Sequence, residues 1–313
     1  GQQTYINLLR LLLLSPIIFA VSNTLGSVLV TKERFFWYGI SASLFNLGTI
    51  LGTLFLTGTF GIYGAALGTL GGAVLHLIPR LIATAKLYKY RARIRMTATL
   101  KSFGSLMVPR MIGAPIEQLI FLGFNGIAST LVAGSITVLN IAHNFQSMPI
   151  NVIGITLAIA IFPVLSKAAA RSDMKEFKKE FWFTLGISLL ATLGAAFVTY
   201  LIRVPLIKYL IGGGEFGPSE IAITASTLAY FAFSIPTESL SHVFARSFYA
   251  LKNSLIPTII SAIGLGLALI TAPTLVRHHG IQGLAIAYFI GSAAKCLLMF
   301  VFLIPRLAPS ESA

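Results

Sequence analysis

The sequence predicts an all-α polytopic membrane protein, and its composition and its long apolar runs lead to that prediction. Of the 313 residues, 56% are hydrophobic and only 10% are charged, whereas a water-soluble domain carries about a quarter charged residues. Apolar runs of membrane-spanning length recur along the chain, separated by basic residues or by Gly and Pro. A soluble globular enzyme is therefore excluded.

About nine transmembrane helices can be assigned, because about 20 residues at a rise of 1.5 Å cross a 30 Å hydrocarbon core. They are residues 6–30, 37–58, 62–85, 98–123, 129–166, 181–202, 219–245, 254–276 and 281–304. Two cations lie near the ends of the early spans. Arg10 is close to the end that we assign to the outside, and Arg80 follows Pro79 near the inner end, where its side chain is expected to snorkel to the interface in a structural role.

The fifth span decides the topology. Residues 129–166 are too long for one straight crossing yet contain no convincing polar turn, and Pro149, Gly154 and Pro163 can bend a single helix. Counted as one span, one side of the membrane carries Lys32, Arg34, Lys86, Lys89, Arg91, Arg93, Arg95, Lys101, Lys167, Arg171, Lys175, Lys178, Lys179, Arg246, Lys252 and Arg306. The other side then carries only Arg203, Lys208 and Arg277.

Counting the fifth span as two crossings would largely abolish this asymmetry, which membrane proteins need for orientation. We therefore expect one long, bent helix. The N-terminus and the loops near 58–62, 124–130, 203–218 and 277–280 are expected outside, and the C-terminus in the cytoplasm. The net charge of +14 thus serves orientation, and no nucleic-acid partner is expected. The single cysteine, Cys296, allows no intramolecular disulfide.

An internal repeat is visible in two glycine-rich segments. Gly61-Ile62-Tyr63-Gly64 opens the third span, and Gly280-Ile281-Gln282-Gly283, 219 residues later, opens the ninth. Parallel repeats of this kind are typical of transporters whose two lobes rock about a central site, although such segments also recur by chance. The repeat predicts a partial N-lobe of three helices (1–88), a basic cytoplasmic linker (89–97), a six-helix C-lobe (98–306) and a cytoplasmic tail (307–313). Three helices would be missing at the N-terminus.

Polar residues inside spans are the candidate site, since charge in a bilayer is costly and normally faces a partner or a wet cavity. They are Arg110 and Glu117, seven residues apart, the cluster His143, Asn144, Gln146 and Ser147 before Pro149, and Glu238 and Lys295. Lys295 stands at the repeat position of His76. Packing by interhelical ion pairs or hydrogen bonds is the alternative to a substrate cavity. No catalytic motif or metal-ligand spacing is present, so no enzyme activity and no metal are expected.

Three motifs resemble the MurJ (MviN) family of lipid II flippases, in the multidrug/oligosaccharidyl-lipid/polysaccharide exporter superfamily. Arg246-Ser247-Phe248-Tyr249-Ala250, followed by Asn253, Ser254 and Pro257, is similar to a signature at the cytoplasmic end of a helix. Pro109-Arg110, Gly113 and Gln118 resemble a second motif, and Phe162-Pro163-Val164-Leu165-Ser166 a third.

The resemblance implies helices four to twelve of a fourteen-helix fold with two six-helix lobes around a cavity. Such proteins flip lipid II, an undecaprenyl-diphosphate-linked disaccharide-pentapeptide, across the bacterial cytoplasmic membrane by alternating access, without a cofactor and driven by an ion gradient or the membrane potential. Among the cavity arginines that hold the diphosphate, only Arg110 is carried over, because Asn144 stands where many members have an arginine. Membrane lipids are the other expected partners.

Two alternatives stay open. An exporter of another polyprenyl-linked glycan or of a cationic drug belongs to the same architecture, and a drug exporter would depend on the carboxylates of Glu117 and Glu238 rather than on Arg110. An inactive, truncated membrane scaffold is the alternative from another functional class.

Overall fold

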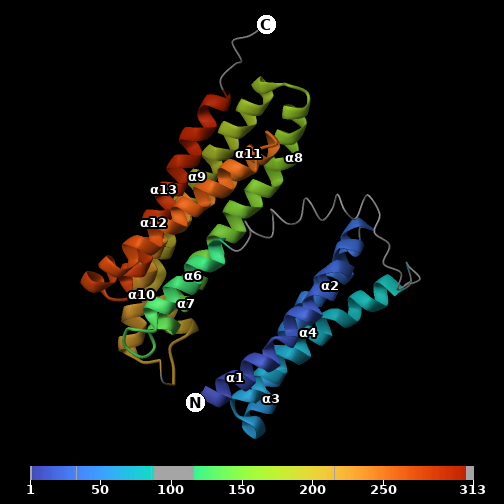
Figure 1. The fold of residues 1–313 in the computed structure, drawn as a ribbon, viewed down its shortest axis with the longest axis vertical. Coiled ribbons are helices and arrows are strands. Elements are labelled where there is room, and N and C mark those ends of the chain that lie inside the picture. The colour runs from blue at the N-terminus through green and yellow to red at the C-terminus, as the bar shows by residue number, and fades with distance from the viewer. Residues whose placement is uncertain (1, 33, 86, 88–115, 215, 308–313) are drawn as a thin grey trace. The chain divides into compact units, whose positions relative to one another are not determined.

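The computed structural model describes residues 2–32, 34–85, 87, 116–214 and 216–307, and all the elements of this part are helices (Figure 1). The chain divides into two compact units, residues 1–96 (the N-unit) and 97–313 (the C-unit). The fold class expected from composition is confirmed. Within the described residues, seven helices are long and apolar enough to cross a membrane, so the predicted count of nine is not confirmed.

The N-unit contains α1 (Gln2–Leu12), α2 (Leu14–Thr31), α3 (Phe35–Phe60) and α4 (Ile62–Ala85). Its three predicted spans are found at the expected places. Helices α3 and α4 pack at very short distance because glycines face one another. A Cβ on Gly52 would lie 2.0 Å from the Cα of Gly68, and one on Gly48 would lie 2.5 Å from the Cα of Gly72. Close approach of this kind is how helices associate inside a bilayer.

The described residues of the C-unit, from 116 onward, form nine helical elements. They are α6 (Ile116–Ala128), α7 (Ser135–Pro149), the π-helical turn η1 (Ile150–Ile155), α8 (Thr156–Ala170), α9 (Met174–Leu210), α10 (Pro218–Ala232), α11 (Ser234–Ala250), α12 (Leu255–His279) and α13 (Gln282–Leu307). In Figure 1 the α8–α9 turn lies at the upper end of this unit and the α9–α10 loop at the lower end.

Helices α7, η1 and α8 form one continuous helical segment over 135–170, which confirms one long helix in place of two. The π-turn begins directly after Pro149, because proline has no N–H and disturbs the regular hydrogen-bond ladder. Gly154, which was expected to bend the helix, instead allows close packing against α11. A Cβ at this position would lie 2.5 Å from Ser239 Oγ.

Two predicted boundaries were wrong. The fifth span begins at Ser135 rather than at 129, since the hydroxyls of Ser129 and Thr130 bind carbonyls of the last turn of α6 and end it there. The predicted span 219–245 is divided at Phe233 into α10 and α11. Pro236 in the first turn of α11 cannot donate to the preceding turn, which accounts for the break. The predicted span 98–123 lies mostly outside the described residues.

The 219-residue repeat is confirmed in the backbone. Gly61 (φ 55°, ψ −138°) and Gly280 (φ 59°, ψ −142°) end α3 and α12 in almost identical conformations. These positive φ values favour glycine because a side chain would be strained. A Cβ on Gly64 would lie 2.4 Å from the carbonyl carbon of Leu56, and a Cβ on Gly283 would lie 2.4 Å from that of Leu275. The pairs α3–α4 and α12–α13 are therefore two copies of one motif.

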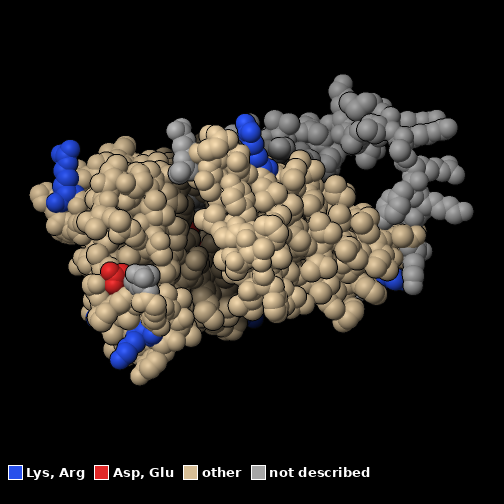
Figure 2. Space-filling view, turned by 90° about the horizontal axis from the view of Figure 1, so that it is seen from below, with Lys and Arg blue, Asp and Glu red and all other residues tan. Residues whose placement is uncertain are grey.

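The surface of the described residues is suited to lipid. Figure 2 shows a face that is almost wholly uncharged, with a few separated charged side chains. Large apolar side chains are exposed along the spans, among them Phe55 at 73%, Leu190 at 73% and Ile270 at 76%. A water-soluble protein rarely exposes apolar patches of this extent.

Candidate functional site

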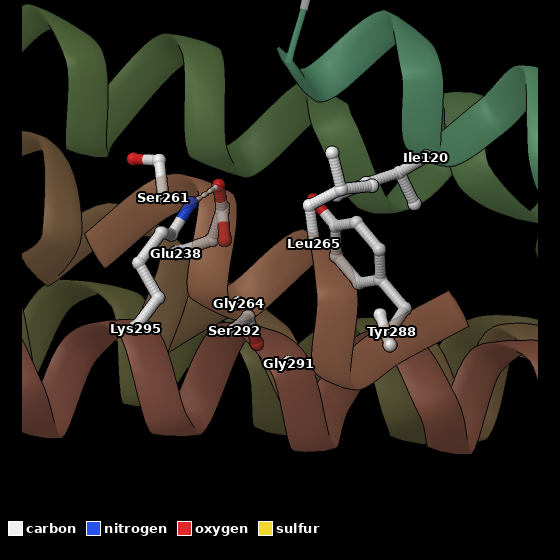
Figure 3. A pocket seen from close by; sticks show the side chains of 10 residues that line it. Ile120, Glu238, Ser261, Gly264, Leu265, Tyr288, Gly291, Ser292 and Lys295 are labelled. Carbon is white, nitrogen blue, oxygen red and sulfur yellow. Dashed lines mark hydrogen bonds and ion pairs between the residues drawn. The ribbon is translucent and has the colours of Figure 1, made fainter. Parts of the chain in front are cut away.

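A buried ion pair joins α11 and α13 in the C-unit. The Nζ atom of Lys295 lies 2.5 Å from Oε1 of Glu238. The two residues are only 9% and 4% exposed, and Figure 3 shows their side chains meeting at one end of a pocket. Each charge compensates the other, which is how buried charge is tolerated. The sequence proposed both residues but did not pair them.

Glycines place this pair in a narrow space. A Cβ on Gly291 would lie 2.5 Å from the carbonyl oxygen of Gly264, so α12 and α13 touch beside Lys295. The pocket is lined from α6, α11, α12 and α13, and Tyr288 closes its other end (Figure 3). Its volume of about 20 Å³ is the room of one water molecule. This pocket is therefore too small to hold a lipid head group.

The polar cluster on α7 forms a hydrogen bond with the first residue of α11, next to the break after α10. The Nε2 atom of Gln146 donates to Ser234 Oγ at 2.9 Å, and Ser234 Oγ donates to the carbonyl of Phe231. Both side chains are fully buried. Gln146 Oε1 has no hydrogen-bond partner among the described residues. A buried acceptor of this kind normally has a bound water.

His143 is half-buried beside an aromatic group. Its Nε2 lies 3.1 Å from Ser147 Oγ, and its ring centre lies 3.8 Å from that of Phe121 on α6. The ring of Tyr288 on α13, which also lines the pocket of the ion pair, is 6.2 Å away. Tyr288 thus connects the α7 cluster with the Glu238–Lys295 pair.

The structure does not bring every predicted residue into this region. Asn144 and Gln118 are exposed, and their side chains have no hydrogen-bond partner in the part of the chain that the structure describes. Arg110 and the side chain of Glu117 lie outside the described residues, so their predicted roles stay predictions.

The residues of the family signature build a turn at the C-terminal end of α11. Lys252 has a φ of 58°, and the amides of Lys252 and Asn253 bind the carbonyls of Tyr249 and Phe248, which is a Schellman motif. The Asn253 side chain then accepts from the amide of Ile256 and caps α12.

The other signature residues support the same turn. Pro257 is buried in the first turn of α12, where its missing N–H has no cost. Arg246 stacks over the ring of Tyr249 at 5.7 Å. These contacts explain the signature by local geometry without any substrate.

Arg80 corrects a sequence expectation. Its side chain does not snorkel to an exposed position: the residue is 3% exposed, and Nη1 donates to the carbonyl of Ser22 and to Asn23 Oδ1, both at 3.1 Å. The guanidinium also lies 4.7 Å from the ring centre of Tyr38. The structural role expected for Arg80 is supported, because these contacts tie α4 to α2 and α3.

The repeat relates two of the buried basic residues, His76 and Lys295. His76 Nδ1 on α4 lies 2.8 Å from Ser22 Oγ on α2, and its ring centre lies 5.0 Å from that of Phe19. Shifted by 219 residues, His76 corresponds to Lys295 and Phe19 to Glu238. Both copies thus use the same position for a basic side chain that contacts the helix two before it.

Sequence reasoning missed the hydroxyls that link these helices. Thr237 Oγ1 and Ser292 Oγ lie 2.8 Å apart between α11 and α13, and Ser234 binds Gln146. Serine and threonine inside apolar spans are the signal that could have found them. Within the described residues, no group of three or more His, Cys, Asp or Glu side chains could hold a metal ion.

Known proteins resemble this chain over nearly its whole length. The family described as "Lipid II flippase MurJ" matches residues 2–312. A probable lipid II flippase MurJ of Bdellovibrio bacteriovorus is 27% identical over 266 residues, which cover 83% of this chain and 50% of that protein. One of Helicobacter pylori is 26% identical and covers 91% of this chain and 66% of the relative. The chain spans about half to two thirds of these relatives.

Solved structures agree with the fold. An inward closed lipid II flippase MurJ has a TM-score of 0.82 at 23% identity, covering 95% of this chain and 62% of that one. An inward-facing multidrug resistance MATE transporter of the MOP superfamily has a TM-score of 0.84 at 17% identity, covering 96% and 71%. At these identities the likeness shows the fold alone. The match of the family over residues 2–312, however, shows that the chain belongs to the MurJ family.

Proposed function

We propose that this chain serves in flipping lipid II from the inner to the outer leaflet of a bacterial cytoplasmic membrane, by alternating access and as a transporter rather than an enzyme. The observation that supports this most is the family match over residues 2–312. The repeat of α3–α4 in α12–α13 fits a carrier with two related lobes. In this proposal the N-unit is the partial first lobe and the C-unit the second.

The state of Glu238 favours a phosphate-bearing substrate over a cationic drug. A drug exporter would need a carboxylate that can receive its cation, but Glu238 is already paired with Lys295 at 2.5 Å. A diphosphate instead suits a guanidinium, which donates two hydrogen bonds in a fork. We assign this contact to Arg110.

The proposed orientation follows from the cations at the two ends of the C-unit. One end carries Lys167, Arg171, Lys175, Lys178, Lys179, Arg246, Lys252 and Arg306, whereas the other carries Arg203, Lys208 and Arg277. Cytoplasmic loops are enriched in Lys and Arg. We therefore place the turns at 171–173 and 251–254 in the cytoplasm and the loop at 211–217 outside.

Expression of the chain in a bacterium depleted of its own lipid II flippase tests the proposal. Growth and labelling of lipid II at the outer leaflet are expected to recover with the chain and to fail with Arg110→Ala. Lys175→Ala is the matched control, since Lys175 is exposed and far from any proposed contact. Membrane levels of each variant are measured by immunoblot.

Three outcomes would contradict this assignment. Failure of the wild-type chain at normal membrane level favours an inactive scaffold. Full rescue by Arg110→Ala removes that residue from the mechanism. Resistance to cationic drugs without lipid II transport favours an exporter of another class.

A further inference from the structure

A second, larger groove lies between α9 and α10, and it shares no lining residue with the Glu238 pocket. It is an open groove of about 720 Å³, the size of a small-molecule site. Arg203 and Lys208 line it from α9, Ala222 and Ala229 line it from α10, and Phe233 lines it from the break after α10. Neither the proposed lipid II transport nor the family signature accounts for it.

The length of α9 places the basic end of the groove at the membrane surface. Residues 181–202 contain no charged side chain and are about 33 Å long at 1.5 Å per residue, which matches the hydrocarbon core. Phe183 and Phe197 within this stretch are 65% and 63% exposed, as lipid-facing side chains are. Arg203 follows directly and Lys208 lies about 7.5 Å further along. Both cations are therefore at the depth of lipid head groups.

The two cations lack an anionic partner within the described part of the chain. Arg203 stacks over the ring of Tyr200 at 4.2 Å and donates to the Tyr200 carbonyl in its own helix. Lys208 lies 5.8 Å from the ring centre of Tyr209. The carboxylate of Glu220 on α10 does not line the groove and accepts from Ser219 Oγ. Among the described residues, Arg203 and Lys208 are thus the charged side chains that line the groove, and both are positive.

The rest of the groove is apolar. The ring of Tyr200 lies 6.4 Å from the ring of Phe233, and small alanines line the groove along α10. Tyr200 and Tyr230 add the aromatic side chains that favour the membrane interface. The groove therefore combines two cations that suit a phosphate with apolar side chains that suit a hydrocarbon chain.

We propose that this groove binds an anionic phospholipid, with the phosphate against Arg203 and Lys208 and an acyl chain along α10. The charge complementarity argues for an anionic head group. The position of the groove at the level of the lipid head groups argues for a membrane lipid rather than a soluble phosphate. Basic pockets between transmembrane helices bind anionic lipids by the same physics. This site is independent of the proposed transport of lipid II.

Native mass spectrometry of the purified chain in detergent tests the site. Phosphatidylglycerol and phosphatidylcholine with identical acyl chains are titrated separately, and glycerol phosphate serves as the soluble head-group probe. The wild-type chain is expected to retain phosphatidylglycerol in preference to the other two. The double variant Arg203→Ala/Lys208→Ala is expected to bind it about tenfold more weakly.

Two further variants make the test specific. Lys175→Ala/Lys179→Ala removes two exposed cations at the opposite end of α9 and is expected to leave binding unchanged. Ala222→Trp fills the groove from an exposed position without removing charge and is expected to weaken phosphatidylglycerol binding. Circular dichroism and size-exclusion chromatography show that each variant is folded.

Any of four results would overturn the proposal. These are equal binding of the two phospholipids, an equal loss in the Lys175/Lys179 variant, unchanged binding by the folded groove variants, and competition by glycerol phosphate alone. Displacement of phosphatidylglycerol by lipid II from the same groove would also overturn it, because the groove would then be a substrate site.

Discussion

At the scale of single residues, the Glu238–Lys295 pair shows how an apolar bundle accommodates charge. Two ions in a medium of low dielectric constant lose their hydration, and only a close partner offsets that loss. The contact at 2.5 Å between α11 and α13 provides the partner. Arg80 in the N-unit is accommodated differently, by a carbonyl, an amide side chain and an aromatic ring. Both arrangements tie helices together.

The losses of stability from removing each member of the ion pair should not add. Glu238→Gln or Lys295→Met alone is expected to lower the free energy of unfolding by about 3 kcal/mol, because the remaining group is buried without its partner. The double variant is expected to lose less than the sum. Thermal unfolding in detergent measures the coupling, and Lys175→Met, at an exposed site, should change nothing. Additive losses would show that the pair has no energetic coupling.

At the scale of elements, glycine contacts and helix caps determine how the spans meet. The same backbone approach occurs at Gly72 and at Gly291, where an added Cβ would lie 2.5 Å from the carbonyl oxygen of Phe45 and of Gly264. The α8–α9 and α11–α12 turns also share one design. In each, a residue with a φ of 58°, Ser172 or Lys252, is followed by an Asp or Asn that caps the next helix.

Neighbouring glycines on α4 should respond in opposite directions to alanine. Gly72→Ala would force the backbones of α3 and α4 apart and is expected to destabilise the chain by about 1–3 kcal/mol. Gly71→Ala meets nothing within 4 Å and is expected to stabilise it by up to about 1 kcal/mol, since alanine favours helix. Melting temperatures decide the question. Equal effects of the two substitutions would contradict the glycine contact.

The two helix-capping side chains, Asp173 and Asn253, should each contribute to the stability of the chain. Asp173→Ala and Asn253→Ala each remove a side-chain acceptor at 2.9 or 3.1 Å from a backbone amide, and each is expected to cost about 1 kcal/mol. Chemical or thermal unfolding measures the change. Asp173→Asn keeps an acceptor and serves as the control. A loss as large in this control would assign the effect to charge rather than to capping.

At the scale of the whole molecule, the surface and the cations define how the chain meets the membrane. The exposed face is apolar (Figure 2), and cations gather at one end of the C-unit. If residues 135–170 cross the membrane once, most cations of the loops lie on one side of it. Two crossings would place these cations on both sides. The orientation proposed above follows from this distribution of charge.

Cysteine labelling tests the orientation. In a Cys296→Ser background, Ser129→Cys is expected to react with a membrane-impermeant maleimide in intact cells. Lys175→Cys is expected to react only after the membrane is permeabilised, because the positive-inside rule places it in the cytoplasm. Both sites are exposed. Labelling with the opposite pattern would reverse the orientation.

The sequence by itself determined the helical membrane class, the single long fifth helix, which it placed at 129–166 rather than at 135–170, and the repeat between α3–α4 and α12–α13. These properties depend on local hydropathy, on charge counts and on glycine spacing, all of which can be read along one chain. The break at Phe233 was missed although Pro236 is visible, because a proline is compatible with either a kink or a break.

Only the tertiary structure decided which polar groups meet. Glu238 and Lys295 are 57 residues apart, and their pairing depends on the rotation of α11 and α13 about their axes, which hydropathy does not specify. The burial of Arg80 and the exposure of Asn144 depend on neighbouring helices in the same way. The groove of Arg203 and Lys208 likewise exists only because α9 and α10 lie side by side.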